Sequence, residues 1–419
     1  MTGLEPPPLR DDCFALPAGV DWTPVDSALS LLKSRLAPVA NAATLPLGDA
    51  HGRVLAENVA AKRANPPLPN SAVDGYGFAH DSLTGGIQRL ALVEGRAAAG
   101  NSFRDRVPAG HAVRILTGAS LPEGVDTVVL QEDVTPGHGE IAFRSGIRKS
   151  ANTRKAGEDV ACGETILKSG RIVMPADLAL AAATGHGEIN VYEQLRVAIM
   201  STGDELEEPG GNLSSDRIFD ANRPMLSGLV SRSGYMPIDM GRVPDDRNLL
   251  RRRLDEAAGK AHAIITSGGA SAGDEDHVSA LLNDEGAMTQ WRIAIKPGRP
   301  LALGLWKGIP VFGLPGNPVA ALVCTLIFAR PALGLLAGQN WFEPQGYMLP
   351  AGFAKSSKRG RREFLRARVR NGHVEAFKSE GSGRISGLSW AEGLAELPDE
   401  AFEVHPGMMV RYIPFANFL

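Results

Sequence analysis

The chain has 419 residues, of which 43% are hydrophobic and 22% are charged, a composition typical of a soluble globular protein with two or three domains. A formal net charge of -3 argues against non-specific binding to nucleic acid or to membranes. Cys13, Cys162 and Cys324 are far apart in the sequence, so neither a disulfide framework nor a zinc site is indicated, and we expect a cytoplasmic location.

The N-terminal part of the chain predicts a discontinuous first domain. Thr23 is the expected N-cap of an amphipathic helix whose apolar residues recur at helical spacing as far as Leu36. From about Asn65 to Thr153, short apolar runs separated by glycine and proline predict a compact β domain. A helical pattern returns at residues 175–183, so the β domain is interpreted as an insertion.

From Arg196 onwards, strand and helix patterns alternate, which predicts a doubly wound α/β domain. Helices are expected after Asn222 and over residues 245–258. The longest apolar stretch, residues 319–329, is expected to be too short to span a bilayer and to end at Arg330 and Pro331.

Beyond Phe342 the pattern is again that of strands. Between Leu365 and Arg370 apolar residues alternate with arginines, which predicts a strand with a polar face. Asn371-Gly372 predicts a two-residue hairpin turn. The arginines are either solvated residues or a source of cations for a neighbouring site. The predicted domains are 20–62 with 156–194, 63–155, 195–340 and 341–419.

Three of the predicted strands, at residues 197–200, 263–265 and 311–312, lead into loops that contain glycine together with acids or hydroxyls. In an open parallel sheet such loops lie at the carboxyl ends of the strands, where backbone N–H groups and helix N-termini face an anion. Together they predict one anion-binding crevice, although each loop alone is also consistent with a plain connecting turn. Acids beside an anion would repel it unless a divalent cation lay between them, so magnesium is suggested by Asp204, Glu205, Asp274, Glu275 and Asp276.

The chain contains a series of short motifs in a specific order and spacing: Ser71–Tyr76, Arg114–Ala119, Leu121–Gly124, Arg154–Asp159, Ser201–Leu206, Asp220–Asn222, Ser267–Asp276, Ile295–Pro300 and Leu314–Val319. Together these segments resemble the MoeA family of molybdopterin molybdenumtransferases, to which the E domain of gephyrin is related. The resemblance covers nearly the whole chain.

The resemblance implies a multidomain α/β plus β fold: an elongated, L-shaped chain with a discontinuous first domain, a β insertion, a doubly wound α/β molybdopterin-binding domain and a C-terminal β barrel. It implies that the protein inserts molybdenum from molybdate into adenylated molybdopterin, releases AMP and depends on Mg2+. It also implies a homodimer whose site is shared between the subunits. A molybdopterin adenylyltransferase and molybdoenzyme maturation proteins are further possible partners, whereas nucleic acid and membrane are not expected.

The family's site residues are carried over by motif. The metal is assigned to Asp245, Asp276 and Asp274, with capping of the helix that Asp245 opens as the competing interpretation for Asp245. The catalytic residues implied are Asp74, Thr117, Asp159, Glu205 and Lys296, of which the first three would complete the site across the dimer interface. The substrate-binding residues implied are Ser267, Gly268, Gly269, Ser271, Gly273, Arg292, Arg299, Pro315, Gly316, Asn317, Pro318, Arg366 and Ser382.

Three positions depart from the family pattern. Arg292 and Arg299 stand where lysine is frequent, which keeps the charge but changes its geometry, and Ala320 stands where serine is frequent. Two other functions are considered, a non-catalytic molybdopterin-binding scaffold and a molybdopterin adenylyltransferase. The retained acids and cations argue against the first, and the β insertion and the C-terminal domain argue against the second.

Overall fold

A computed structural model describes residues 22–211, 215–268, 277–291, 293–298, 301–379, 381 and 383–418. The chain divides into two compact units, one of residues 43–191 and one that combines residues 1–42 with 192–419. The division at residue 42 lies inside the predicted segment 20–62, and the predicted boundary at residues 62 and 63 lies inside the first unit.

In the unit 43–191, segments from either side of the β insertion share one core. β1 (Ala42–Pro46) pairs with β12 (Glu188–Tyr192), and β2 (Val59–Ala60) pairs with β11 (Thr165–Leu167). The helix α2 (Pro175–Ala183) has the predicted bounds. The core consists of Ala50, Leu55, Val59, Leu167, Val173, Ala181, Ile189 and Val191.

The intervening residues form the predicted β region, whose main sheet has the strand order β7-β4-β6-β5-β9-β8. Its strands pair antiparallel, except for the parallel pair β5 and β6. The bounds are β4 (Gly75–Phe78), β5 (Ile87–Ala97), β6 (His111–Ile115), β7 (Thr127–Leu130), β8 (Thr135–Pro136) and β9 (Glu140–Arg144), with β3 (Asn70–Ser71) paired to β10 (Thr153–Arg154).

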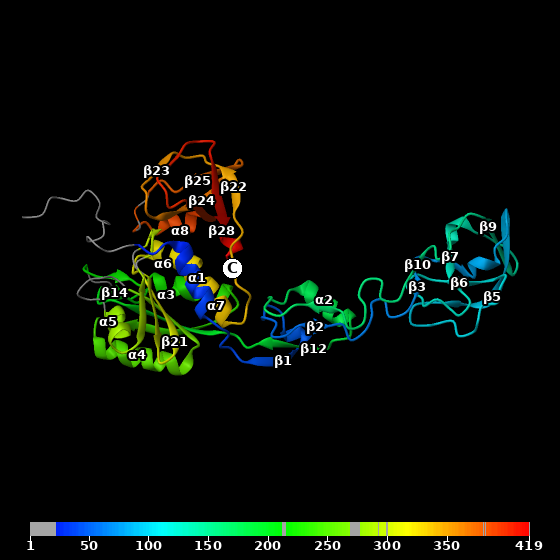
Figure 1. Cartoon of the computed structure of the whole chain (residues 1–419), viewed down its shortest axis with the longest axis horizontal. Coiled ribbons are helices and arrows are strands. Elements are labelled where there is room, and N and C mark those ends of the chain that lie inside the picture. Colours follow the sequence, from blue (N-terminus) through cyan, green and yellow to red (C-terminus); the bar gives the residue numbers. More distant parts are fainter. Residues whose placement is uncertain are drawn as a thin grey trace, which may run out of the picture. The chain divides into compact units, whose positions relative to one another are not determined.

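In the second unit, the predicted α/β domain is confirmed (Figure 1). Its sheet has the order β16-β13-β17-β21-β20-β18, in which the first four strands are parallel and the last two form an antiparallel edge. The bounds are β13 (Arg196–Thr202), β16 (Met236–Val243), β17 (Ala263–Ser267), β18 (Ala287–Trp291), β20 (Leu301–Trp306) and β21 (Ile309–Leu314).

Helices cover this sheet. α4 (Arg247–Lys260) and α5 (His277–Asp284) bury Leu254 and Leu281 against Met200 of β13. α3 (Asn222–Arg232) contacts β13 and β16 and also the helix that begins with α6 (Pro318–Cys324). A short pair, β14 (Leu206–Glu207) and β15 (Ile218–Phe219), lies between β13 and α3 in the chain.

The apolar stretch of residues 319–329 lies in a helix that continues past Arg330 and Pro331. A π-helical segment, Thr325–Ala329, joins α6 to α7 (Arg330–Leu336). Pro331 is tolerated because it lies in the first turn of α7, directly after the π segment has changed the hydrogen-bonding register. The 19-residue helix Pro318–Leu336 is apolar enough to cross a membrane, but its most apolar window is 94% buried, as in a core helix.

The C-terminal strands form a sheet in the order β19-β24-β26-β28-β22, with β25 paired to β24. β19 (Ile295–Lys296) comes from the α/β part of the chain and pairs parallel with β24. The other bounds are β22 (Tyr347–Pro350), β24 (Arg362–Arg370), β25 (His373–Ala376), β26 (Gly393–Leu397) and β28 (Met409–Pro414), with β23 (Lys355–Ser357) paired to β27 (Phe402–Val404) and α8 as Ser386–Trp390.

The predicted hairpin is confirmed. Asn371 and Gly372 both have positive φ angles, 50° and 76°, as a type I′ turn requires. Burial on the predicted polar face of β24 differs along the strand: Arg366 is only 5% exposed, whereas Arg370 at the end of the strand is exposed. The guanidinium groups of Arg366 and Arg368 lie over the rings of Phe377 and Trp390, at 4.8 and 4.4 Å from the ring centroids.

The helix α1 (Val25–Arg35) begins after Pro24, and its cap makes no side-chain hydrogen bond, so the prediction that Thr23 is the N-cap is wrong. Instead the carbonyl oxygen of Thr23 accepts a hydrogen bond from the backbone N–H of Ala294 (2.8 Å). Asp26, in the first turn, is bound by both terminal nitrogens of Arg362 on β24, at 2.9 and 2.8 Å.

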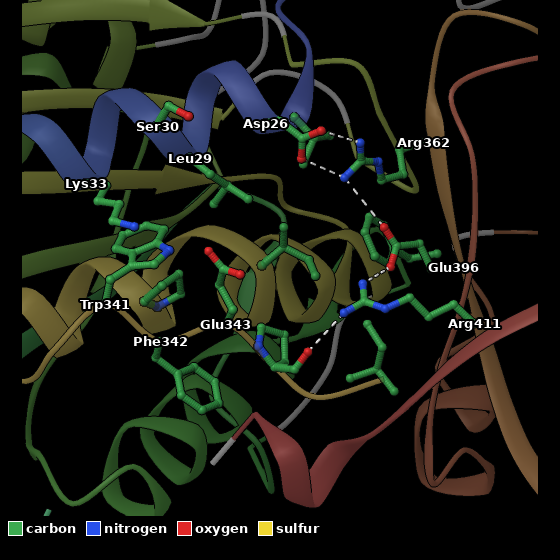
Figure 2. A pocket seen from close by; sticks show the side chains of 16 residues that line it. Asp26, Leu29, Ser30, Lys33, Trp341, Phe342, Glu343, Arg362, Glu396 and Arg411 are labelled. Carbon is green, nitrogen blue, oxygen red and sulfur yellow. Dashed lines mark hydrogen bonds and ion pairs between the residues drawn. The ribbon is translucent and has the colours of Figure 1, made fainter. Parts of the chain in front are cut away.

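A line of alternating charges continues from this pair across the C-terminal sheet (Figure 2). Arg362 also reaches Asp399 (3.1 Å) and Glu396 (3.5 Å), and Glu396 in turn binds Arg411. Asp26, Arg362, Glu396 and Arg411 line one side of a cavity of about 360 Å³ between α1, the 341–344 segment and the sheet. The charge line therefore fastens the C-terminal sheet to α1.

Arg362→Ala should lower the free energy of unfolding by about 2–3 kcal/mol, because it leaves three carboxylates without a half-buried cation. Urea denaturation followed by tryptophan fluorescence measures the change. Arg370→Ala on the same strand is the control, since the pair of Arg370 with Glu392 is exposed and its loss should cost less. Equal losses in the two variants would contradict a special role for Arg362.

Candidate functional site

The three predicted crevice strands are immediate neighbours. β17 pairs on one side with β13, where Ser267 is opposite Ser201, and on the other side with β21, where Ser267 is opposite Leu314. Because all three strands run parallel, their carboxyl ends lie at the same edge of the sheet. The loops that follow them therefore begin side by side, as the sequence predicted.

Asn222, the first residue of α3, ties two of these loops together. Its side-chain Nδ2 donates to Ser267 Oγ and to the carbonyl oxygen of Gly316, both at 2.6 Å. Asn222 was not among the predicted site residues. The sequence did contain a signal for Asn222, because the Asp220–Asn222 motif is one of the segments that carry the family resemblance.

Glycine is required at position 268 of this crevice. Gly268 has a φ of +95°, and a Cβ there would overlap the carbonyl oxygen of Thr202. Gly316 lies against the Cα of Gly268, but a Cβ at Gly316 would meet nothing closer than 3.7 Å. Asn317 caps α6 by accepting from the backbone N–H groups of Val319 and Ala320, at 3.0 and 3.3 Å. Pro315 and Pro318 flank this turn, which follows β21 at the carboxyl end of the sheet.

The crevice edge contains buried polar atoms that the described part of the chain does not satisfy. Such atoms cost about 1–3 kcal/mol each when they have no partner, so they indicate positions where a ligand or water binds. From the sequence, these atoms could have been predicted only by the Asp220–Asn222 motif and by the presence of hydroxyl residues at strand ends. Within the described residues the atoms without a partner here are Ser201 Oγ, Thr202 Oγ1, Thr266 Oγ1 and Asn222 Oδ1.

Two acids meet beside the crevice. The backbone N–H of Asp204 donates to the Asp245 carboxylate, and that of Asp245 donates to the Asp204 carboxylate, both at 3.2 Å. The helix cap is the next residue, Asp246, which accepts from Leu249 N at 2.7 Å, so the alternative that Asp245 caps α4 is wrong. The Glu205 carboxylate lies against Gly203. Over the described residues, three metal-ligating side chains do not come together at any one point.

Lys296 is held by a buried acid. Its Nζ lies 3.1 Å from Glu363 Oε1, while Lys355 Nζ lies 3.2 Å from Glu363 Oε2. Glu363 is only 4% exposed, and Lys296 lies opposite it in the parallel pairing of β19 with β24. The position of Lys296 is therefore set by the C-terminal sheet. Sequence reasoning did not find Glu363, although an acid among the apolar residues of a strand was a usable signal.

Arg366 organises the segment that follows the hairpin. Its terminal nitrogens donate to the carbonyl oxygens of Arg384 (2.6 Å), Ser379 (2.6 Å) and Gly381 (3.3 Å). Burial lowers the pKa of this guanidinium from its ordinary value.

Three predicted catalytic residues lie in the other unit. Asp74 Oδ1 accepts from both the hydroxyl and the backbone N–H of Thr117, each at 2.7 Å, and these bonds lower the pKa of Asp74. Asp159 instead accepts from Asn65 Nδ2 at 2.9 Å. The structure thus brings Asp74 and Thr117 into direct contact.

The remaining predicted site residues lie outside the described part of the chain. They are Gly269, Ser271, Gly273, Asp274, Asp276, Arg292, Arg299 and Ser382.

A doubly wound sheet with a polar crevice at the carboxyl ends of its parallel strands is the architecture of a nucleotide- or pterin-binding domain. Comparison with family models identifies the class. Residues 198–334, which hold the crevice, match a probable molybdopterin binding domain. Residues 23–185 match the MoeA N-terminal region (domain I and II), and residues 349–415 match the MoeA C-terminal region (domain IV).

Full-length relatives agree with this class. The chain is 36% identical over 403 residues to a molybdopterin molybdenumtransferase of Haemophilus influenzae, covering 94% of this chain and 99% of the relative. It is 34% identical to molybdopterin molybdenumtransferase 2 of Mycobacterium tuberculosis, over 88% and 94% of the two chains. A molybdopterin biosynthesis protein MoeA of Pyrococcus horikoshii has a TM-score of 0.82 at 29% identity, with 94% and 100% coverage. The chain therefore belongs to the molybdopterin molybdenumtransferase family, as the motifs indicated.

Gly268→Ala should destabilise the protein by about 2 kcal/mol or more, because alanine is strained at this φ and its Cβ overlaps backbone. Gly316→Ala, in the same crevice, should change stability by less than about 1 kcal/mol, since its Cβ has space. Thermal unfolding of both variants checks the contrast. A Gly268 variant as stable as the Gly316 variant would show that the β17 loop is free to shift.

Thr117→Val should raise the pKa of Asp74 towards its ordinary value, because the largest stabilising bond to the carboxylate is lost while the backbone bond remains. Carbon-13 NMR titration of labelled aspartate measures it. Since the folded pKa lies below the unfolded value, the bond contributes stability above about pH 4 and loses it as the pH falls through the folded pKa. An unshifted pKa in the variant would show that the hydroxyl is not the controlling donor.

Proposed function

We propose that this protein inserts molybdenum from molybdate into adenylated molybdopterin and releases AMP, as a step of molybdenum cofactor biosynthesis. The observation that carries the proposal is the crevice at the ends of β13, β17 and β21, which lies within the region matched by the probable molybdopterin binding domain. The family membership supports the same step, because relatives that match over nearly their whole length are named molybdopterin molybdenumtransferases.

The crevice supplies what a pyrophosphate-linked substrate needs. Gly268 allows the chain to approach a ligand closely, and the N-terminus of the helix that starts at Pro318 begins at the same edge of the sheet. Lys296 contributes a positive charge from β19, and Arg366 provides a guanidinium suited to a tetrahedral oxyanion. We assign molybdate to the part of the site that these two cations serve.

Mg2+ is part of the proposal. Asp204 and Asp245 present oxygen ligands of the type that Mg2+ prefers, and they are already adjacent. They would hold the ion together with Asp276 or Asp274. When bound, the ion would neutralise phosphate charge next to the acids of the crevice. Glu205 is assigned to orienting water or the ion beside this pair.

We further propose a cytoplasmic homodimer in which the pair Asp74 and Thr117, with Asp159, completes the site of a partner subunit. The scaffold alternative predicts binding of adenylated molybdopterin without turnover. The adenylyltransferase alternative predicts consumption of ATP, and the matches to the MoeA N-terminal and C-terminal regions favour the insertion step over it.

The test is AMP release from purified adenylated molybdopterin, with and without Mg2+ and molybdate, followed by reactivation of an apo-molybdoenzyme with the product. The proposal expects AMP release that needs both ions and no ATP. Tight binding without turnover would favour the scaffold, and ATP-dependent formation of adenylated molybdopterin would favour the adenylyltransferase.

Asp245→Asn should reduce the rate of Mg2+-dependent AMP release at least about tenfold, because it removes a carboxylate charge while keeping an oxygen that accepts from Asp204 N. The apparent Mg2+ affinity should fall in parallel. Asp246→Ala is the neighbouring control: it removes the helix cap, costs about 1 kcal/mol of stability and should leave the rate unchanged. Equal rates in Asp245→Asn and the unmodified protein would refute the metal assignment.

A further inference from the structure

The amide nitrogen of Asn222 makes hydrogen bonds, whereas its amide oxygen has no partner among the described residues. Its position is fixed by the start of α3, where Asp220 Oδ1 accepts from the backbone N–H groups of Asn222 and Arg223, both at 3.2 Å. Arg223 in turn binds Asp220, Asp239 and Glu208 through its guanidinium. Asp220 is 1% exposed and Arg223 is 8% exposed, so this helix start is locked in the interior.

The orientation of the Asn222 amide follows from its partners. Nδ2 carries two hydrogens, and both are used, by Ser267 Oγ and by the carbonyl oxygen of Gly316. A carbonyl oxygen only accepts, so rotating the amide by 180° would place two acceptors against each other. The amide oxygen Oδ1 must therefore point away from the Gly316 carbonyl.

Oδ1 in this fixed orientation is buried, and no described residue donates to it. Asn222 as a whole is 7% exposed. The hydroxyl of Ser201 is also buried without a described partner, and it projects from the same face of the sheet as Ser267 because the two residues are paired on neighbouring parallel strands. The crevice edge thus holds a buried acceptor on α3 and a buried hydroxyl on β13.

We propose that Asn222 is a specificity-determining residue: its Nδ2 holds the loops after β17 and β21 in register, and its Oδ1 accepts a hydrogen bond from an N–H or O–H group of the adenylated pterin. The inference rests on the proposed function. An amide oxygen repels phosphate oxygens, so the group it receives belongs to the pterin, the ribose or the adenine of the substrate. A site built to bind such a donor rejects analogues that lack it, because Oδ1 would then stay unpaired.

The test is equilibrium binding of adenylated molybdopterin to the full-length protein without molybdate, so that no turnover occurs. Asn222→Ala should weaken binding at least about tenfold. Asn222→Ser, a good residue at a helix start, is a second variant that tests the same loss if alanine impairs folding. Ser231→Ala, at an exposed position of the same helix, is the matched control and should bind as the unmodified protein does.

Ser267→Ala separates the two roles of Asn222, since it removes one bond to Nδ2 and leaves Oδ1 in place. The inference expects a smaller loss of affinity in Ser267→Ala than in either Asn222 variant. An equal or larger loss, or unchanged binding in both Asn222 variants, would overturn it. If the unmodified protein binds adenylated molybdopterin but releases no AMP with both ions present, the proposed function fails while the Asn222 contact is still measured.

Discussion

The parallel pairing of β13, β17 and β21 is the constraint on which the crevice depends. A parallel strand cannot return through a tight turn, so each strand must leave the sheet at the same edge and reach a helix or a long loop. Ser201, Ser267 and Leu314 are placed across from one another by register alone. Asn222 then adds a side-chain bond between the loops that register has brought together. Backbone pairing therefore sets the position of the loops, and the Asn222 amide sets the distance between them.

The same logic links the crevice to the C-terminal sheet. β19 lies in the chain between β18 and β20 of the α/β sheet but pairs with β24, so this segment connects the two sheets. Glu363 and Lys355 are nearly buried, and a buried carboxylate is tolerated only with cations close to it. Lys296 is one of those cations. Its ammonium group is therefore positioned by the interior charge of Glu363 rather than by solvent, which limits how far it can move towards an anion.

Local patterns in the sequence predicted the elements that depend on local chemistry. The bounds of α2, the turn at Asn371-Gly372 and the crevice strands followed from periodicity and turn residues. The N-cap of α1 did not follow from local patterns, because the carbonyl oxygen of Thr23 is held by a hydrogen bond from Ala294. The continuation of the helix to Leu336 did not follow either, because a π segment carries it past Pro331. The pairing of Asp204 with Asp245 joins residues 41 positions apart, and the Asn222 bond to Gly316 joins residues 94 apart, so no spacing rule reveals them.

Arg366 shows how burial changes the role that a charged side chain on a predicted polar face can have. Alternation placed it on a polar face, yet the aromatic ring of Phe377 and three carbonyl oxygens surround its guanidinium. A guanidinium has five N–H donors, so these bonds leave about two for an oxyanion. Among the described residues the hydrogen-bond partners of this guanidinium are neutral carbonyls, which do not compensate its charge, and such a charge is worth more to an anion in a buried site than in water. The carbonyls thus hold the guanidinium in a fixed orientation without neutralising it, as the proposed binding of molybdate requires.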